Sequence, residues 1–307
     1  MGKKKKQYKK QNKNNSKILL SGSPSEAAYS PRPQDLSLCM IARDEEKNIG
    51  ECLDSVKSFV DEIIVVDTGS RDRTVEIAKE YGAKVIETEW RNDFSYARNI
   101  SLENAECGWI LWLDADDRIP EESAESFKEL KKQKRDRYFA FKVRNLKKVG
   151  LGEDFCQVRM FPNDPDFRFE RPVHEQIQIS LLRKGLLKIN LPVIILHTGY
   201  QCKELNKEKA QRNREILLED FKNNPDDLNY TAAIGDTYYI TEDYSQAREW
   251  YNRAFNIPYA RNKQGDIFKQ MPVALAMCEI RLKNDDEAMK WVNRGLKLQN
   301  DKIDTLM

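Results

Sequence analysis

The chain has 307 residues, of which 40% are hydrophobic and 33% are charged, as is typical of a globular protein with one large domain or two smaller ones. Its net charge is +2, but residues 1–17 contain eight lysines and no acidic residue, so the rest of the chain carries a net charge of −6. A mildly acidic body argues against a protein whose main surface binds nucleic acid.

Membrane segments, targeting signals and disulfides are not expected either. No apolar run approaches the roughly 18 residues of a membrane span, and the stretch after Lys3–Lys6 has no apolar core of signal-peptide length. The six cysteines are scattered without a Cys-x-x-Cys pair, and a chain of this size needs no disulfide framework. We therefore expect a cytoplasmic protein with reduced thiols and no membrane span.

The N-terminal stretch, residues 1–34, is rich in Lys, Asn and Gln and then in Ser and Pro. It lacks the apolar residues that would offset the entropy lost on ordering, so a disordered basic tail is predicted. The alternative is an arm that binds an acidic partner. Nucleic acid is expected only in non-specific contacts with this tail.

Short apolar runs alternate with helical patterns between residues 36 and 113. The predicted strands are Leu36–Ile41, Glu62–Val66, Lys84–Glu87 and Trp109–Leu113. The predicted helices are Asn48–Phe59, Thr74–Tyr81 and Ser95–Ala105. Crossovers of this length imply parallel strands and an α/β sheet that is covered on both faces.

Polar residues follow three of these strands, at Asp44–Glu46, Asp67–Ser70 and Asp114–Asp117. In an open α/β sheet, ligands bind beyond the carboxyl ends of the strands, so these three groups should lie side by side. An edge rich in carboxylates is unfavourable without a cation or hydrogen-bond donors. The Asp-x-Asp of the last group could hold a hard divalent cation, whereas the alternative interpretation is a solvated turn.

After Pro120 the pattern predicts an amphipathic helix over Glu121–Lys134 and then changes to period two. The further predicted strands are Tyr138–Arg144, Cys156–Phe161, Val173–Ile179 and Leu186–Leu196. We expect them to extend the sheet with antiparallel members and to build the far wall of a cleft. The chain's two histidines, His174 and His197, both fall in this part.

From about Glu204 the chain is predicted to be helical, and residues 228–259 match the tetratricopeptide pattern. The residues at its small and bulky positions are Ile234, Gly235, Tyr238, Ala247, Tyr251 and Ala254. A second, weaker unit uses Leu275, Ala276, Ala288, Val292 and Gly295. Because about three repeats are usually needed for stability, the two should lean on the preceding domain, on the helix Lys203–Phe221 or on another chain.

Apolar residues lie close to the C-terminus, at Trp291, Leu296, Leu298 and Leu306. Repeat arrays need capped ends for solubility. The last helices are therefore predicted either to pair with a second copy, forming a homodimer, or with a protein acceptor, or to fold back onto the preceding repeat.

Four motifs occur in a characteristic order, namely Asp44-Glu45-Glu46, Val66-Asp67-Thr68-Gly69-Ser70-x-Asp72-x-Thr74, Asp93-Phe94-Ser95-x-Ala97-Arg98-Asn99 and Leu113-Asp114-Ala115-Asp116. In this order they resemble family 2 glycosyltransferases, which have a GT-A fold and invert the anomeric centre. A second block resembles one branch of that family, which includes transferases fused to tetratricopeptide repeats, such as bacteriocin S-glycosyltransferases. Its motifs are Arg159-Met160-Phe161, Arg168-Phe169-Glu170, Val173-His174-Glu175 and Ile195-Leu196-His197-x-Gly199-Tyr200.

The resemblance implies an α/β, Rossmann-like GT-A domain with a mixed sheet over residues 35–202, followed by an all-α tetratricopeptide-like region over residues 203–307. It also implies contacts with the nucleotide sugar, which we expect at Ala42, Asp44, Glu46, Asp67, Ser70, Asp72, Arg98 and Asp114. Arg98 could face phosphate, or it could be a helix-surface arginine that is paired with an acid.

The metal and the general base are expected among the strand ends. Asp114 and Asp116 would hold Mg²⁺ or Mn²⁺, and His197 would complete the metal shell, unless it is a structural histidine. An inverting displacement needs one carboxylate to take the acceptor proton, and Glu175 is the predicted base, with Asp154 as the competitor.

The predicted function is metal-dependent, inverting transfer of a hexosyl or N-acetylhexosaminyl group, with a UDP-sugar as the expected donor and a protein, peptide or glycan as the acceptor. The alternative is a tetratricopeptide-type binding module with an inactive transferase domain. A nucleotidyltransferase would need a Gly-rich phosphate loop near the first strand, and Ala42–Glu46 contains no glycine.

Overall fold

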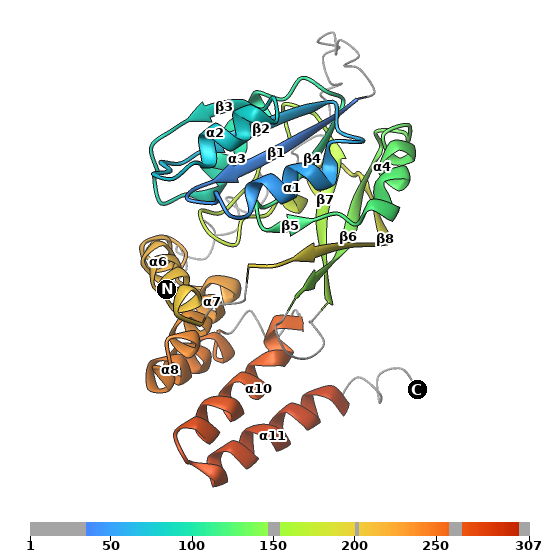
Figure 1. Ribbon diagram of the computed structural model, residues 1–307. Helices are drawn as coiled ribbons and strands as arrows, with labels where there is room; N and C mark the ends of the chain where they lie inside the picture. Colours follow the sequence, from blue (N-terminus) through green and yellow to red (C-terminus); the bar gives the residue numbers. More distant parts are fainter. Residues whose placement is uncertain (1–34, 147–153, 200–202, 258–265, 301–307) are drawn as a thin grey trace, which may run out of the picture. The chain divides into compact units, whose positions relative to one another are not determined.

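The computed structural model of the protein describes residues 35–146, 154–199, 203–257 and 266–300 (Figure 1). The predicted basic tail therefore lies outside the described residues. None of the helices in the described ranges is long and apolar enough to cross a membrane.

The described chain is built on one mixed sheet, with the strand order β3-β2-β1-β4-β7-β6-β8-β5. The strands are β1 Leu36–Ala42, β2 Glu62–Asp67, β3 Lys84–Glu87, β4 Trp109–Trp112, β5 Asp117–Arg118, β6 Arg137–Asn145, β7 Asp154–Pro162 and β8 Leu187–His197. Strands β1 to β4 run parallel, as the sequence predicts. Residue Ala42 lies opposite Asp67, so the carboxyl ends of β1 and β2 meet at one edge.

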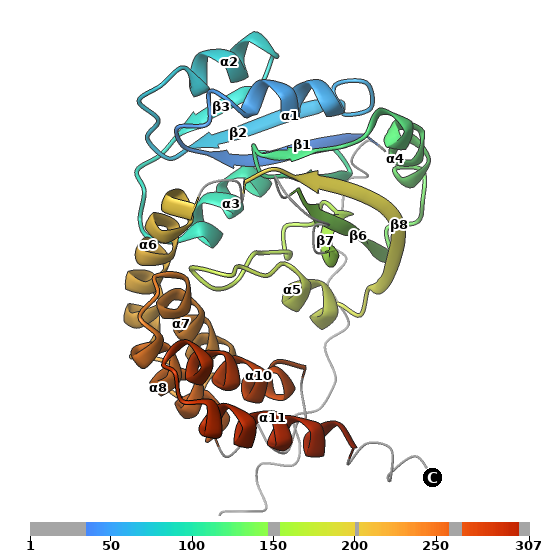
Figure 2. The same ribbon diagram turned by 60° about the horizontal axis from the view of Figure 1, so that its bottom comes forward.

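Helices cover both faces of the parallel part of the sheet (Figure 2). They are α1 Ile49–Val56, α2 Thr74–Glu80 and α3 Phe94–Glu103, and the 3-10 turn η1 Glu121–Ser123, α4 Ala124–Leu130 and α5 Gln178–Arg183 follow later in the chain. Side chains alternate between the faces of a strand. In β4, Trp109 and Leu111 join the core beneath α1 and α2, whereas Ile110 and Trp112 join the opposite core with Leu102 of α3.

Two predictions for the second half of the sheet are corrected. Val173–Ile179 is not a strand, because positive φ angles at Arg171 (81°) and His174 (54°) turn the backbone, leaving one isolated bridge between Glu170 and Gln176 before α5 begins. The antiparallel expectation holds for β7, which runs antiparallel to β4 and β6, but β8 runs parallel to β6.

The C-terminal region is helical, as predicted. Its described helices are α6 Lys203–Phe221, α7 Leu228–Ile240, α8 Tyr244–Phe255, α10 Asp266–Arg281 and α11 Asp285–Asn300. Helices α7 and α8 each begin after an aspartate N-cap. Asp227 accepts hydrogen bonds from Asn229 N and Tyr230 N, and Asp243 accepts one from Gln246 N.

The α7–α8 hairpin is packed closely at the positions that the repeat pattern singles out. Ala247 and Ala254 are fully buried, and a Cβ at Gly235 would lie 2.6 Å from the Tyr251 ring. In the last hairpin, Trp291 and Leu298 pack against this same core, as the fold-back alternative expects.

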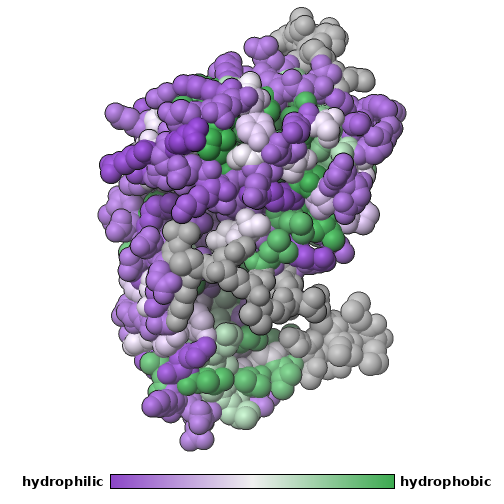
Figure 3. Space-filling model, viewed as in Figure 1, coloured by the Kyte–Doolittle hydropathy of each residue, from purple (hydrophilic) through white to green (hydrophobic). Residues whose placement is uncertain are grey.

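Other apolar side chains of the α10–α11 hairpin are exposed, namely Val273, Met277, Ile280, Met289, Val292 and Leu296. Figure 3 shows hydrophobic surface over the same hairpin, in the lower part of the view. The predicted homodimer through the helical region stays a prediction, and Leu306 lies outside the described residues.

The first helices of this region pack against the loop that replaces the predicted strand. Val173 lies in one apolar cluster with Leu217 of α6 and Ile234 of α7, and Arg171 forms an ion pair with Asp227 at 3.1 Å. These contacts match the expectation that two repeats would lean on the preceding domain.

The close packing of α7 and α8 predicts that Ala247→Leu lowers the free energy of unfolding by about 1–3 kcal/mol, because extra methylenes would overpack a fully buried position. Urea denaturation followed by circular dichroism would measure the loss. Ser245→Leu, at an exposed position on the same helix, is the matched control and should change stability little. Equal stability of the two variants would contradict the packing described here.

Candidate active site

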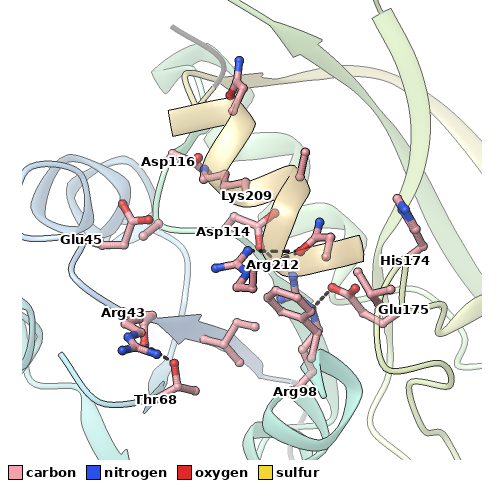
Figure 4. Close-up of a pocket in the computed structure, with 18 of the residues that line it drawn as sticks. Arg43, Glu45, Thr68, Arg98, Asp114, Asp116, His174, Glu175, Lys209 and Arg212 are labelled. Atoms are coloured by element: carbon pink, nitrogen blue, oxygen red, sulfur yellow. Dashed lines mark hydrogen bonds and ion pairs between the residues drawn. The ribbon is translucent and has the colours of Figure 1, made fainter. Parts of the chain in front are cut away.

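A cavity of about 590 Å³ opens at the carboxyl edge of the parallel strands. The ends of β1, β4 and β8, the 173–175 loop and helices α6 and α7 all contribute to its lining (Figure 4). Of the residues predicted from the sequence, it brings together Ala42, Arg98, Asp114, Asp116, Glu175 and His197. This is where the acidic strand end meets the helical region.

Asp114, Asp116, Asp117 and His197 form a cluster whose potential ligand atoms all lie within 4.8 Å of one another. Asp114 and Asp116 lie between β4 and β5, Asp117 begins β5, and the pairing of β5 with β8 places Asp117 opposite His197. Carboxylate oxygens with one imidazole suit Mg²⁺ or Mn²⁺, so this cluster could hold a divalent cation.

Asp117 orients the histidine of this cluster. Its carboxylate is fully buried, accepts a hydrogen bond from Asp114 N at 2.9 Å, and lies 2.8 Å from His197 Nδ1 and 3.1 Å from Arg159 Nη2. With Nδ1 held by a carboxylate, the metal-binding nitrogen of His197 would be Nε2. From the sequence, Asp117 was expected only as part of the acidic turn after the strand Trp109–Leu113.

Gly199 allows the cluster to close. A Cβ at this position would lie 3.0 Å from both Asp116 Cγ and His197 Nε2, and closer still to Asp116 Oδ2. Backbone contacts hold the same segment in place, since Thr198 N donates to Asp116 O at 2.9 Å. Only a residue without a side chain leaves room here for both ligands.

Two buried arginines balance the charge of the acids. Arg98, on α3, lies 2.7 Å from Asp114 Oδ1 and 2.6 Å from Glu175 Oε1, and Asp93 caps the start of that helix. Arg159, on β7, lies 3.4 Å from Asp114 Oδ2, and both guanidinium groups stack on Trp112, at 4.2 and 3.8 Å from the ring centroid. Arg98 is therefore paired with acids, as one of the two sequence alternatives expected, but in the interior rather than on the surface.

Because of this arrangement, the pKa values of the two aspartates of the Asp-x-Asp motif shift in opposite directions. Burial and the nearby Asp114 carboxylate raise the pKa of Asp116 to about 6. Burial acts in the same direction on Asp114, but the Arg98 and Arg159 guanidiniums outweigh it and hold its pKa well below the usual range. Asp114 is thus compensated by the protein itself, whereas Asp116 needs a further positive charge to be a carboxylate at low cost.

Five predicted donor contacts do not line the cavity; they are Asp44, Glu46, Asp67, Ser70 and Asp72. They hold the loops after β1 and β2 together. Ser70 Oγ accepts from Asp44 N at 2.9 Å, and Asp72 Oδ2 accepts from Glu46 N at 3.0 Å. Asp67 accepts hydrogen bonds from Gly69 N and Ser70 N within its own turn. Their predicted role in donor binding stays a prediction.

The two candidate bases, Glu175 and Asp154, lie in different surroundings. Glu175 lines the cavity, and its side chain is only 13% exposed. Asp154, at the start of β7, lies outside the lining and is held by a bidentate pair with Arg144 at 2.8 Å. Arg159 was not predicted as a site residue, although a charge inside the apolar strand Cys156–Phe161 is a signal that could have indicated it.

A Rossmann-like mixed sheet with Asp-x-Asp at its carboxyl edge, followed by paired helices, defines a protein of the GT-A class. The sequence model of the family described as glycosyl transferase family 2 matches residues 37–206. This match spans more than half of the chain, and the chain belongs to that family.

Two relatives illustrate the range of similarity. A TPR repeat-containing protein of Synechococcus elongatus is 36% identical over 256 residues, covering 76% of this chain and 63% of that protein. The SPbeta prophage-derived glycosyltransferase SunS of Bacillus subtilis is 29% identical over 222 residues, covering 71% of this chain and 52% of that protein. The matched part of the chain thus spans between about half and two thirds of the length of these relatives.

Solved structures are more distant. S. aureus TarS 1–349 in complex with UDP-GlcNAc has a TM-score of 0.49 at 15% identity, covering 84% of this chain and 90% of that chain. A second structure is glucosyl-3-phosphoglycerate synthase from Mycobacterium tuberculosis in complex with Mn²⁺, uridine diphosphate and glucosyl-3-phosphoglycerate. Its TM-score is 0.41 at 20% identity, and the match covers 62% of this chain and 80% of that chain. Neither neighbour assigns a substrate to this chain.

Proposed function

We propose that this chain is a metal-dependent, inverting glycosyltransferase that uses a nucleotide-sugar donor, with a UDP-sugar as the first candidate. The observation that carries the proposal is the cluster of three aspartates and His197 at the carboxyl edge of the sheet. Membership of glycosyl transferase family 2 supports glycosyl transfer as the reaction class.

A divalent cation fits this cluster, because the potential ligand atoms of three carboxylates and one imidazole lie within 4.8 Å of one another, and the buried Asp116 carboxylate faces His197 at 3.4 Å rather than an arginine. Asp114, Asp116 and His197 would hold the ion, and Asp117 would keep the imidazole oriented. When bound, such an ion supplies Lewis-acid stabilisation of a leaving diphosphate.

Glu175 is the proposed general base. Its Oε1 atom is held by Arg98, which also holds Asp114, so the base and the metal cluster are fixed relative to each other by one buried guanidinium. The acceptor atom would attack the anomeric carbon while its proton passes to Glu175, and the bond from that carbon to the diphosphate oxygen would break. Displacement from the opposite face inverts the anomeric centre.

The acceptor would enter from the side of the helical region. Helix α7 contributes Asp236, Thr237 and Ile240 to the lining of the same cavity. Tyr251 donates a hydrogen bond to Asp236 at 2.7 Å, so α8 also fixes a polar group of this wall. We propose a protein, peptide or glycan acceptor, and a hexosyl or N-acetylhexosaminyl group as the sugar transferred.

Calorimetry with UDP tests the metal cluster. Binding is expected with Mn²⁺ and should be lost with a chelator, and Asp116→Asn should largely remove the effect of the metal because it replaces a charged ligand with a neutral amide. Asp286→Asn, at an exposed position of α11, is the control and should bind as the original protein does. Metal-independent binding, or full activity of Asp116→Asn, would refute the assignment.

A screen of UDP-, GDP- and dTDP-sugars for metal-dependent hydrolysis would identify the donor. Failure to bind or hydrolyse any of them, together with capture of a protein partner, would favour the alternative of a binding module with an inactive transferase domain.

A further inference from the structure

Helix α6 turns one face toward the candidate active site. Asn206, Lys209, Ala210 and Asn213 line the cavity at the three- and four-residue spacing that brings side chains to one helix face, and Arg212 lines it beside them. Figure 4 shows Lys209 and Arg212 on this helix, bordering the cavity that holds Asp114 and Asp116. The family match ends at residue 206, so both cations lie beyond the part of the chain that it covers.

These two cations are not neutralised within the described protein. Among the described residues, neither Lys209 nor Arg212 forms an ion pair, whereas Arg98, Arg159 and Lys207 do. Within the described part of the chain, Arg212 donates long hydrogen bonds of 3.4 Å to its neighbour Asn213 and stacks over the Phe94 ring, with Cζ 5.1 Å from the centroid. Phe94 thus holds the guanidinium on an aromatic surface at the cavity.

A third cation, Arg43, lines the same cavity. Arg43 follows β1, and its pairing with Asp44 is long, at 3.8 Å. Burial and the positive charge of Arg43 lower the pKa of Arg212. Two guanidiniums that repel each other across a cavity are stabilised by an anion placed between them.

We propose that Lys209 and Arg212 of α6 bind the diphosphate of the nucleotide sugar, and that the helical region thereby completes the donor site. This inference rests on the proposed function and extends it to residues outside the family match. The diphosphate would lie between the metal cluster on the sheet edge and the cations on α6. Arg212 suits this role because its planar fork can donate two hydrogen bonds to phosphate oxygens.

On this proposal, the helical region takes part in donor binding as well as in acceptor docking. A repeat region that only docked an acceptor could be removed without loss of donor binding. If α6 supplies charges to the leaving group, donor binding and acceptor docking depend on the same helix, and Val173, Leu217 and Ile234 hold that helix against the transferase domain.

The test is calorimetry on the full chain with inorganic pyrophosphate, UDP and uridine in the presence of Mn²⁺, and with Mn²⁺ alone. The double variant Lys209→Gln/Arg212→Gln should lose roughly tenfold to 100-fold in affinity for pyrophosphate and UDP, because each substitution removes a charge-assisted contact to phosphate. Its affinity for uridine and for Mn²⁺ alone should not change. Arg212→Lys should retain part of the affinity, since it keeps the charge without the fork.

Lys222→Gln is the control, because Lys222 follows α6, is exposed and pairs with Glu219 on the helix surface. Unchanged pyrophosphate binding by the double variant would overturn the inference while leaving the proposed function intact if the variant still turns over a nucleotide sugar. Pyrophosphate binding that depends on Lys209 and Arg212, in a protein that binds no nucleotide sugar, would support the anion site and refute the proposed function. Absence of pyrophosphate binding by the original protein, or loss of Mn²⁺ affinity in the double variant, would overturn the inference.

Discussion

Replacing Gly199 with alanine is expected to abolish metal-dependent nucleotide binding while leaving the protein folded. The new Cβ would lie 3.0 Å from Asp116 Cγ and from His197 Nε2, so two of the three proposed ligands would be displaced by one methyl group. The nearest atoms belong to the end of the Asp116 side chain, which can rotate away. The fold would therefore accommodate the methyl group, but the ligand geometry would not.

We expect the affinity for Mn²⁺ to fall roughly 100-fold or more, since even the loss of a supporting contact costs 10- to 100-fold in metal sites. Calorimetry with Mn²⁺ and UDP would measure the loss, and circular dichroism would check the fold. Gly50→Ala is the matched control, because its new Cβ would have neighbours no closer than 3.7 Å. Normal metal binding by Gly199→Ala would show that Asp116 and His197 are not joint ligands.

Replacing Glu175 with glutamine is expected to stop turnover and to preserve UDP binding. A general base contributes about 10²- to 10⁴-fold to a rate, and glutamine cannot accept the acceptor proton. Arg98 would keep its pair with Asp114 at 2.7 Å, so the metal cluster should stay in place. Metal-dependent hydrolysis of the donor sugar and calorimetry with UDP would measure the two effects separately.

Asp154→Asn decides between the two bases that the sequence left open. Asp154 is paired with Arg144 at 2.8 Å and does not line the cavity, so we expect this variant to turn over the donor at the original rate. The reverse result, an inactive Asp154→Asn and an active Glu175→Gln, would transfer the role of base to Asp154. Loss of UDP binding in Glu175→Gln would instead assign Glu175 a structural role.

The parallel half of the sheet could be predicted because its signals are local. Each strand is a short apolar run, each crossover carries a helical period, and turn formers separate them, so β1 to β4 were expected close to their observed bounds. That Asp67 and Asp114 lie at the same edge of the sheet, after strands on either side of β1, followed from parallel topology. The α7–α8 hairpin was predicted for the same reason, since its small residues recur at fixed spacing.

The structure of the 173–179 segment could not be predicted from local signals. Its alternating pattern predicts a strand, but the backbone turns at Arg171 and His174, and Val173 packs against α6 and α7 instead of pairing in the sheet. The residues of α6 and α7 that provide this contact lie more than 40 positions after Val173 in the chain. No periodicity within the segment could have revealed it.

The sequence by itself determined which chemical groups gather at the edge of the sheet, because the alternation of strands and helices along the chain and their 2.0- and 3.6-residue periods are properties of neighbouring residues. Tertiary structure alone decided how those groups are used. It directed Asp44 and Asp72 into contacts between loops, paired Arg98 with Glu175 across 77 residues of chain, and set Asp117 behind His197. It also brought α6 to the cavity. Charges and hydrogen bonds act through space over a few ångströms, and separation along the chain does not report that distance.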